Sequence, residues 1–161
     1  MNKVAPFSRS DDTTDVWLTP PEIVKALGDF LLDPCSPIDA PWRLTPLFYT
    51  ERHDGLAQPW VGRVFMNPPY GDAMKHWMRK LADHGNGIAL IFARVETRWF
   101  HETVWNAADA VLFFDKRISF YKPDGSRGSG SSAPSCLVAF GEDNAAALKR
   151  CGLGYTVRLR R

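Results

Sequence analysis

The stretch Asn67-Pro68-Pro69-Tyr70 holds the residue types that point most directly to chemistry. Proline fixes its φ angle and lacks an N–H, so the backbone carbonyls around Pro68 keep set directions and stay free to accept hydrogen bonds. The Asn67 side-chain oxygen is a second acceptor, and Tyr70 adds a flat face. This set suits a planar group with an exocyclic amine, whose nitrogen lone pair can then attack an electrophile. A rigid proline turn capped by an aromatic residue is the alternative interpretation.

Two carboxylates in the first half of the chain are further candidates. Asp33 ends a short apolar run over 31–33, which predicts a buried strand that delivers this side chain to its carboxyl end. Ligands of open α/β sheets bind beyond such strand ends. Asn67, directly after the apolar run 64–66, would lie at a second strand end of this kind. Asp54 belongs to the turn dipeptide Asp54-Gly55. Turn-capping is the alternative role for Asp33, and for Asp54 a turn and a ligand contact are compatible.

The helices and strands that must position these residues are predicted from the spacing of apolar residues and from Pro and Gly at element ends. Helices are predicted over 22–27, 73–84 and 98–106. Strands are predicted over 31–33, 64–66, 88–92, 110–114, 118–120, 136–140 and 155–159, with 88–92 as a central parallel strand. Strands interleaved with helices predict a single-domain α/β sheet with helices on both faces.

Length and composition limit the class of protein. A chain of 161 residues is expected to form one domain, and its longest apolar runs are too short to cross a bilayer. The polar residues 1–14 predict a mobile tail before a domain over 15–161, and a Gly-Ser-rich stretch predicts a flexible loop at about 122–134. Three dispersed cysteines and four histidines without ligand spacing predict no disulfide framework and no metal site. With no apolar signal core, we expect a cytoplasmic protein.

Charge divides unevenly along the chain. Residues 1–60 hold 5 Lys and Arg against 9 Asp and Glu, whereas residues 61–161 hold 15 against 9. A basic half suits nucleic acid, and Lys116, Arg117 and Arg127 beside the Gly-Ser loop are the candidate phosphate contacts. Arg94 and Arg98 are weaker candidates of the same kind. A solvated basic surface is the alternative for all of them.

A family resemblance rests on several segments in order. They are Trp17-Leu18-Thr19-Pro20-Pro21, Leu32-Asp33-Pro34-Cys35, Asp54-Gly55-Leu56, Asn67-Pro68-Pro69-Tyr70 and Arg94-Val95-Glu96-Thr97-Arg98-Trp99-Phe100. Together they resemble the phage DNA N-6-adenine methyltransferase (Dam) family, over about residues 15–141. The resemblance implies a reduced Rossmann-like methyltransferase sheet that uses S-adenosylmethionine to methylate N6 of an adenine flipped out of double-stranded DNA.

The resemblance also implies residue roles. Thr19 and Asp33 would hold the methionine end of the cofactor, with Pro34 beside them, and Asp54 would accept from its adenine amino group. The catalytic set would be Asn67, Pro68, Pro69 and Tyr70, with Asn67 also next to the cofactor. The usual glycine-rich turn is replaced by Asp33-Pro34-Cys35-Ser36-Pro37, and the acidic ribose ligand has no clear counterpart, Asp39 and Glu51 being the candidates.

Two other functions share these features. A protein glutamine-N5 methyltransferase can use the same Asn-Pro-Pro-Tyr motif, and a non-catalytic DNA-binding module can keep the fold. The basic half favours DNA over protein as substrate, and the intact motif favours an enzyme. The family resemblance suggests protection of phage DNA from host restriction, which would place the protein in the host cytoplasm.

Overall fold

The computed structural model describes residues 16–159 of the chain, so the predicted mobile tail over 1–14 lies outside the described residues. The strands are β1 (Leu32–Asp33), β2 (Leu47–Phe48), β3 (Val64–Met66), β4 (Gly87–Phe92), β5 (Ala110–Phe114), β6 (Ser119–Tyr121), β7 (Arg127–Gly130), β8 (Ser135–Phe140) and β9 (Gly154–Arg158). The helices are α1 (Pro21–Leu27), α2 (Met74–His84), α3 (Arg98–Phe100) and α4 (Glu142–Arg150), with a 3₁₀ helix η1 (Glu51–His53) and a π-helix η2 (His101–Trp105).

Seven of the strands form one mixed sheet in the order β2-β1-β3-β4-β8-β5-β9, and β6 pairs with β7 in a separate hairpin. Strands β2, β1, β3 and β4 run parallel to one another. Strand β8 is antiparallel to both of its neighbours, β4 and β5. Strand β4 is therefore central as predicted, but only one of its two neighbours, β3, runs parallel to it.

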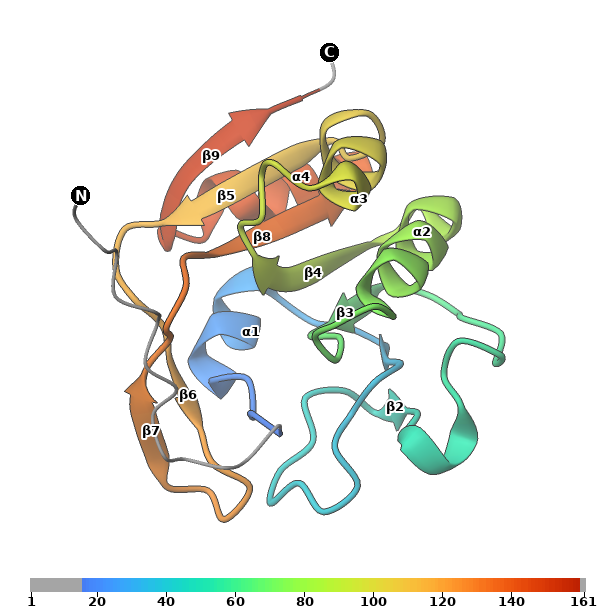
Figure 1. Ribbon diagram of the computed structural model, residues 1–161, viewed down its shortest axis with the longest axis vertical. Helices are drawn as coiled ribbons and strands as arrows, with labels where there is room; N and C mark the ends of the chain where they lie inside the picture. Colours follow the sequence, from blue (N-terminus) through green and yellow to red (C-terminus); the bar gives the residue numbers. More distant parts are fainter. Residues whose placement is uncertain (1–15, 160–161) are drawn as a thin grey trace, which may run out of the picture.

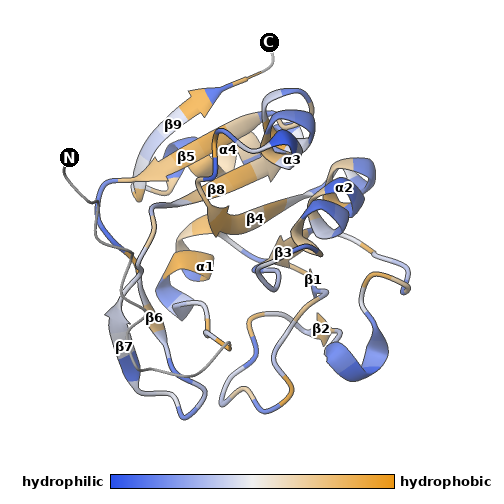
Figure 2. Cartoon of the chain, in the orientation of Figure 1, coloured by the Kyte–Doolittle hydropathy of each residue, from blue (hydrophilic) through white to orange (hydrophobic). Residues whose placement is uncertain are grey.

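Helices cover both faces of this sheet, which confirms the expected α/β layering (Figure 1). Apolar residues of α1 and α4 pack on one face, and those of α2, α3 and η2 pack on the other. The strands β4, β5 and β8 are apolar along almost their whole length, because both of their faces are buried (Figure 2).

The helix boundaries follow the local chemistry that predicts them. Pro21 occupies the first turn of α1, where its missing N–H removes no hydrogen bond, and Gly28 ends the helix at φ 91°. Helix α2 ends at Gly85, which adopts the left-handed conformation at φ 73°. The predicted helix over 98–106 is helical but consists of α3 followed by the π-helix η2.

The predicted flexible loop is wrong for residues 127–130, which form β7 and pair with β6. Glycine and serine give no alternating side-chain pattern that would predict a strand. Here the strand is defined by the pairing of its backbone with β6. The side chain of Trp17 packs so closely on Gly128 that an added Cβ would lie 2.6 Å from the indole. Three further elements, β2, η1 and α4, have no counterpart among the predicted ones.

Candidate active site

The arrangement of β1 and β3 places two predicted site residues at the same edge of the sheet. The chain leaves β1 to form β2 on one side and then returns to form β3 on the other, so the strand order reverses between these neighbours. Ligands of open α/β sheets bind outside the carboxyl ends of strands at such a switch point. Asp33 is the last residue of β1, and Asn67 directly follows β3.

A small pocket lies at this switch point and gathers three of the predicted cofactor residues. Thr19, Asp33 and Asn67 all line it. The other lining residues come from the segment before α1 and from the loop after β1: Trp17, Leu18, Cys35, Ser36, Pro37, Ala40, Trp42 and Leu44. The pocket therefore joins three segments that are far apart in the sequence.

The side chain of Asn67 has one satisfied end and one orphaned end. Its Nδ2 donates a hydrogen bond to Oγ1 of Thr19 at 3.0 Å. Its Oδ1 is buried and has no hydrogen-bond partner among residues 16–159. Buried polar atoms are nearly always paired, so an orphaned acceptor beside a pocket is suited to a ligand donor.

Asp33 is buried, with 6% of its surface exposed, and it has no ion-pair partner in the part of the chain that the structure describes. The backbone N–H of Cys35 donates to its Oδ1 at 3.1 Å. Burial raises the pKa of Asp33 to about 7, although this hydrogen bond, a hydrogen bond with the Ser36 side chain and the positive charge of Arg43 oppose the shift. A buried carboxylate without a direct ion pair is suited to a cationic group such as an ammonium.

Cys35 contributes a thiol to the same pocket, and sequence reasoning gave it no role. Burial, followed by the neighbouring charge of Asp33, raises the pKa of this thiol well above its usual range. The thiol is held neutral at ordinary pH, so its chemistry is that of a small packing group rather than a nucleophile.

The rest of the Asn-Pro-Pro-Tyr motif follows the orphaned amide. Pro68 is buried, and no hydrogen bond among the described residues ends on its carbonyl oxygen. The Tyr70 ring stacks on the Phe92 ring, with centroids 4.2 Å apart and planes 9° apart. Tyr70 remains 40% exposed, while burial around its hydroxyl raises its pKa. The ring of Tyr70 is thus supported by Phe92 at the edge of the sheet that carries Asn67, and no sequence pattern marks Phe92 as its support.

Asp54 lies outside the pocket, on an exposed turn. It adopts a left-handed conformation at φ 51°, and Ala57 donates to its carbonyl at 2.8 Å, so the predicted turn is present. The next residue, Gly55, is pressed against the Pro34 carbonyl, where any Cβ would overlap the backbone. This contact joins the turn to the Asp33-Pro34 loop. Lys80 of α2 also holds the segment, through a hydrogen bond to the Leu56 carbonyl at 2.6 Å.

The two candidates for an acidic ribose ligand do not reach the pocket. Asp39 is exposed in the loop after β1, and Glu51 is exposed at the start of η1. Neither lines the pocket. The structure therefore brings together the residues predicted for the amino-acid end of a cofactor but leaves the ribose position without a predicted carboxylate.

The β6–β7 hairpin holds the segment that carries Thr19. Leu18 and Tyr121 form an isolated antiparallel bridge, with backbone hydrogen bonds of 2.8 and 3.0 Å. Trp42, which also lines the pocket, packs edge-on against the Tyr121 ring, with 5.3 Å between the ring centroids. Figure 1 shows the hairpin extending beyond the sheet beside the start of α1.

The three predicted phosphate contacts lie on or next to this hairpin. Lys116 and Arg117 are exposed where the chain leaves the carboxyl end of β5, and Arg117 donates to the Ser131 carbonyl at 3.1 Å. Arg127 pairs with Glu22 at 3.2 Å and stays largely exposed. All three are therefore attached to the edge of the sheet that carries Asn67.

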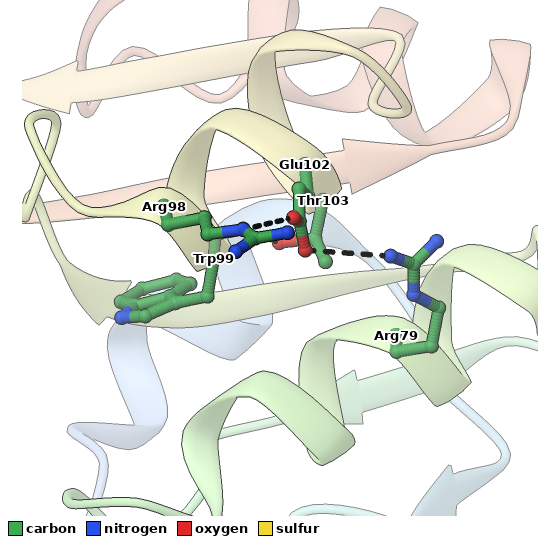
Figure 3. Close-up of polar contacts among 5 residues, drawn as sticks. All are labelled: Arg79, Arg98, Trp99, Glu102 and Thr103. Atoms are coloured by element: carbon green, nitrogen blue, oxygen red, sulfur yellow. Dashed lines mark hydrogen bonds and ion pairs between the residues drawn. The ribbon is translucent and has the colours of Figure 1, made fainter.

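The segment after β4 adds a second exposed group of charges at this edge. Arg98 pairs with Glu102 at 2.8 Å, and Arg79 of α2 approaches the same carboxylate at 3.7 Å (Figure 3). The Thr103 hydroxyl donates to the Trp99 carbonyl at 2.7 Å and so stabilises the helical turn. Arg98 thus has a surface ion pair, the alternative to a phosphate contact, and its side chain remains 92% exposed.

Within residues 16–159, no helix is long and apolar enough to cross a membrane. The same residues contain no group of three or more His, Cys, Asp or Glu side chains that could hold a metal ion.

A mixed sheet with helices on both faces and a polar pocket at its switch point defines an α/β protein with a candidate ligand site after β1 and β3. The chain matches the family described as DNA N-6-adenine-methyltransferase (Dam) over residues 8–148 and belongs to that family. The family is one of DNA adenine methyltransferases, so the expected resemblance is confirmed. No curated protein and no solved structure is significantly similar to the chain.

Proposed function

We propose that this protein methylates N6 of adenine in double-stranded DNA with S-adenosylmethionine as the methyl donor. The mixed sheet would be a reduced Rossmann-like methyltransferase domain over residues 15–161, working in the cytoplasm, and in the host cytoplasm where a phage encodes it. Because N6 is engaged in base pairing, the target adenine would be flipped out of the duplex.

The observation that carries this proposal is the orphaned Oδ1 of Asn67. An adenine amine has two N–H bonds, and here two acceptors follow β3 in succession, Asn67 Oδ1 and the Pro68 carbonyl. Accepting both hydrogens would draw the nitrogen lone pair out of the ring and stabilise the positive charge that develops during transfer. The ring of Tyr70, which packs on Phe92 and is 40% exposed, would stack on the base in this position.

The donor set of the pocket fits the amino-acid end of S-adenosylmethionine. Asp33 is a buried carboxylate without a direct ion pair and would hold the ammonium. The buried Thr19 hydroxyl would donate to the carboxylate. When bound, the donor would supply an electrophilic methyl group, while Asn67 and Pro68 would hold the amine.

The DNA side of the proposal rests on the hairpin. Lys116, Arg117 and Arg127 would contact backbone phosphates from the same edge as the pocket. The structure has no large recognition domain within its described residues, so the loops of this edge would choose the target sequence.

The decisive experiment incubates the purified protein with radiolabelled S-adenosylmethionine and either duplex DNA or a protein mixture. Digestion of the products identifies the modified unit, and N6-methyladenine in DNA is the expected result. Label in glutamine would replace this proposal by the protein-methylating alternative. DNA binding without label in any product would support a non-catalytic module. The Asn67→Ala variant is the matched control for labelling, because it should bind the donor but transfer little methyl group.

A further inference from the structure

Thr19 lies between Asn67, which would hold the target amine, and the pocket that would hold the methyl donor. Its Oγ1 accepts a hydrogen bond from Asn67 Nδ2 at 3.0 Å, and its side chain also lines the pocket beside Asp33. A threonine hydroxyl carries one proton and can donate only once. The direction in which Thr19 donates therefore constrains what the Asn67 amide can do.

We propose that Thr19 is a positioning residue that makes the acceptor orientation of Asn67 depend on an anionic oxygen in the pocket. The inference rests on the proposed function and deepens it, because the anion is the carboxylate of the methyl donor. Binding of the donor thereby prepares Asn67 for the target amine.

The hydrogen-bond polarity gives the reason. When the Thr19 proton is donated to a carboxylate, Thr19 can only accept from Asn67, which requires Nδ2 to face it. Oδ1 then points away as a free acceptor, the orientation that the structure has. Without the carboxylate, Thr19 can donate to Oδ1 of a rotated amide, and Nδ2 would then oppose the N–H bonds of an adenine amine.

Nothing else in the described part of the chain holds the Asn67 amide. Its Oδ1 has no partner, and the contact with Thr19 satisfies its Nδ2. Thr19 itself is well fixed, since it is 4% exposed and directly follows Leu18, which the bridge to Tyr121 holds. The hydrogen bond to Thr19 thus sets the orientation of the Asn67 amide, which the position of Asn67 after β3 does not define by itself.

Nuclear magnetic resonance of the Asn67 side chain tests this without any turnover. The ¹⁵N-labelled amide is assigned by its loss in Asn67→Ala, and S-adenosylhomocysteine is added as a non-reactive ligand that keeps the ammonium and the carboxylate. We expect exchange of the amide protons with water to slow by about fivefold or more, as one hydrogen bond of ordinary strength requires. Methylthioadenosine, which lacks both charged groups, should leave this rate unchanged.

Two variants separate the positioning role from mere packing. In Thr19→Val the slowing should disappear, and in Thr19→Ser it should remain. Thr103→Val removes a comparable buried hydroxyl in the helix after β4 and should behave like the unmodified protein. The same slowing in Thr19→Val, or none in the unmodified protein despite calorimetric binding of S-adenosylhomocysteine, overturns the proposal.

Kinetics give a second readout. At saturating donor, Thr19→Val should lower kcat about tenfold, whereas Thr19→Ser should stay within about threefold of the unmodified protein. An effect on KM for the donor alone, with kcat unchanged, would reduce Thr19 to a cofactor contact and overturn the positioning role. If S-adenosylhomocysteine does not bind at all in calorimetry, the proposed donor is wrong, and this inference falls with it.

Discussion

The ring of Tyr70 lies parallel to the ring of Phe92, with 4.2 Å between their centroids. Phe92 is the last residue of β4, so the strand itself fixes the plane in which Tyr70 can meet a base. A base stacked on Tyr70 would pack against a ring that Phe92 already holds in place. Less side-chain conformational entropy would then be lost when the base binds.

Tyr70→Ala should weaken binding of duplex DNA with a flipped target by about 1–3 kcal/mol, the usual value of one base–aromatic stack. Tyr70→Phe should keep most of the activity, because the face rather than the buried hydroxyl is needed. Fluorescence anisotropy with a duplex that contains the target site measures DNA binding by both variants, and methyl transfer to the same duplex measures their activity. Equal loss in Tyr70→Phe and Tyr70→Ala would assign the hydroxyl a chemical part instead.

Asn67→Ala should lower kcat on the order of 10²-fold, because it removes an acceptor that matters most as N6 becomes positive. Affinity for S-adenosylmethionine should change far less, since Asp33 and the rest of the pocket remain. Single-turnover kinetics and calorimetry separate the two quantities. Near-normal turnover in this variant would remove the motif from the mechanism.

The raised pKa of Asp33 predicts opposite effects on binding and on stability. Donor affinity should fall as pH drops below about 7, because a protonated Asp33 cannot pair with an ammonium. Without ligand, the folded state holds this proton between about pH 4 and 7 while the unfolded state has lost it, so stability falls as pH rises through that window.

Asp33→Asn should accordingly raise the free energy of unfolding by about 1–3 kcal/mol at pH 8, with no gain at pH 4. The same variant should lose donor affinity and its pH dependence. Thermal denaturation at both pH values and calorimetry check the pair of effects. A variant that is destabilised at pH 8 would show that Asp33 is not strained by burial.

Lys116→Gln should weaken DNA binding and reduce the slope of log affinity against log salt by about 1, the share of one phosphate contact. Lys25→Gln is the matched control, because Lys25 lies on α1 outside the hairpin. Titrations between about 50 and 200 mM salt give the slopes. Identical slopes for both variants would place the DNA elsewhere on the surface.

Gly55→Ala should reduce both stability and donor affinity, because its Cβ would overlap the Pro34 carbonyl and push the Asp33-Pro34 loop away from its position. Gly130→Ala, whose Cβ would meet its nearest neighbour only at 3.8 Å, is the control. Calorimetry with S-adenosylhomocysteine and thermal denaturation compare the two. Normal donor affinity in Gly55→Ala would separate the Asp54 turn from the cofactor site.

Sequence patterns locate the site better than they describe its surroundings. Asp33 and Asn67 are predictable because each follows a short apolar run, and strand ends of a parallel sheet meet at one edge. The support of Tyr70 by Phe92 and the bond from Asn67 to Thr19 depend on tertiary packing, which no local pattern encodes. Strand β7 was missed for the same reason, since Gly128 is ordered by Trp17 rather than by its own neighbours.

The position of β8 in the sheet has a consequence during protein synthesis. Strands β4 and β5 both precede β8 in the chain, yet β8 lies between them. Until residues 135–140 have left the ribosome, two apolar strand edges face an empty slot, and the nascent chain exposes pairing surfaces that favour aggregation. A stop codon or ribosome stall before this point therefore leaves an open sheet, so the segment 135–161 decides whether the strands made before it can join into one sheet.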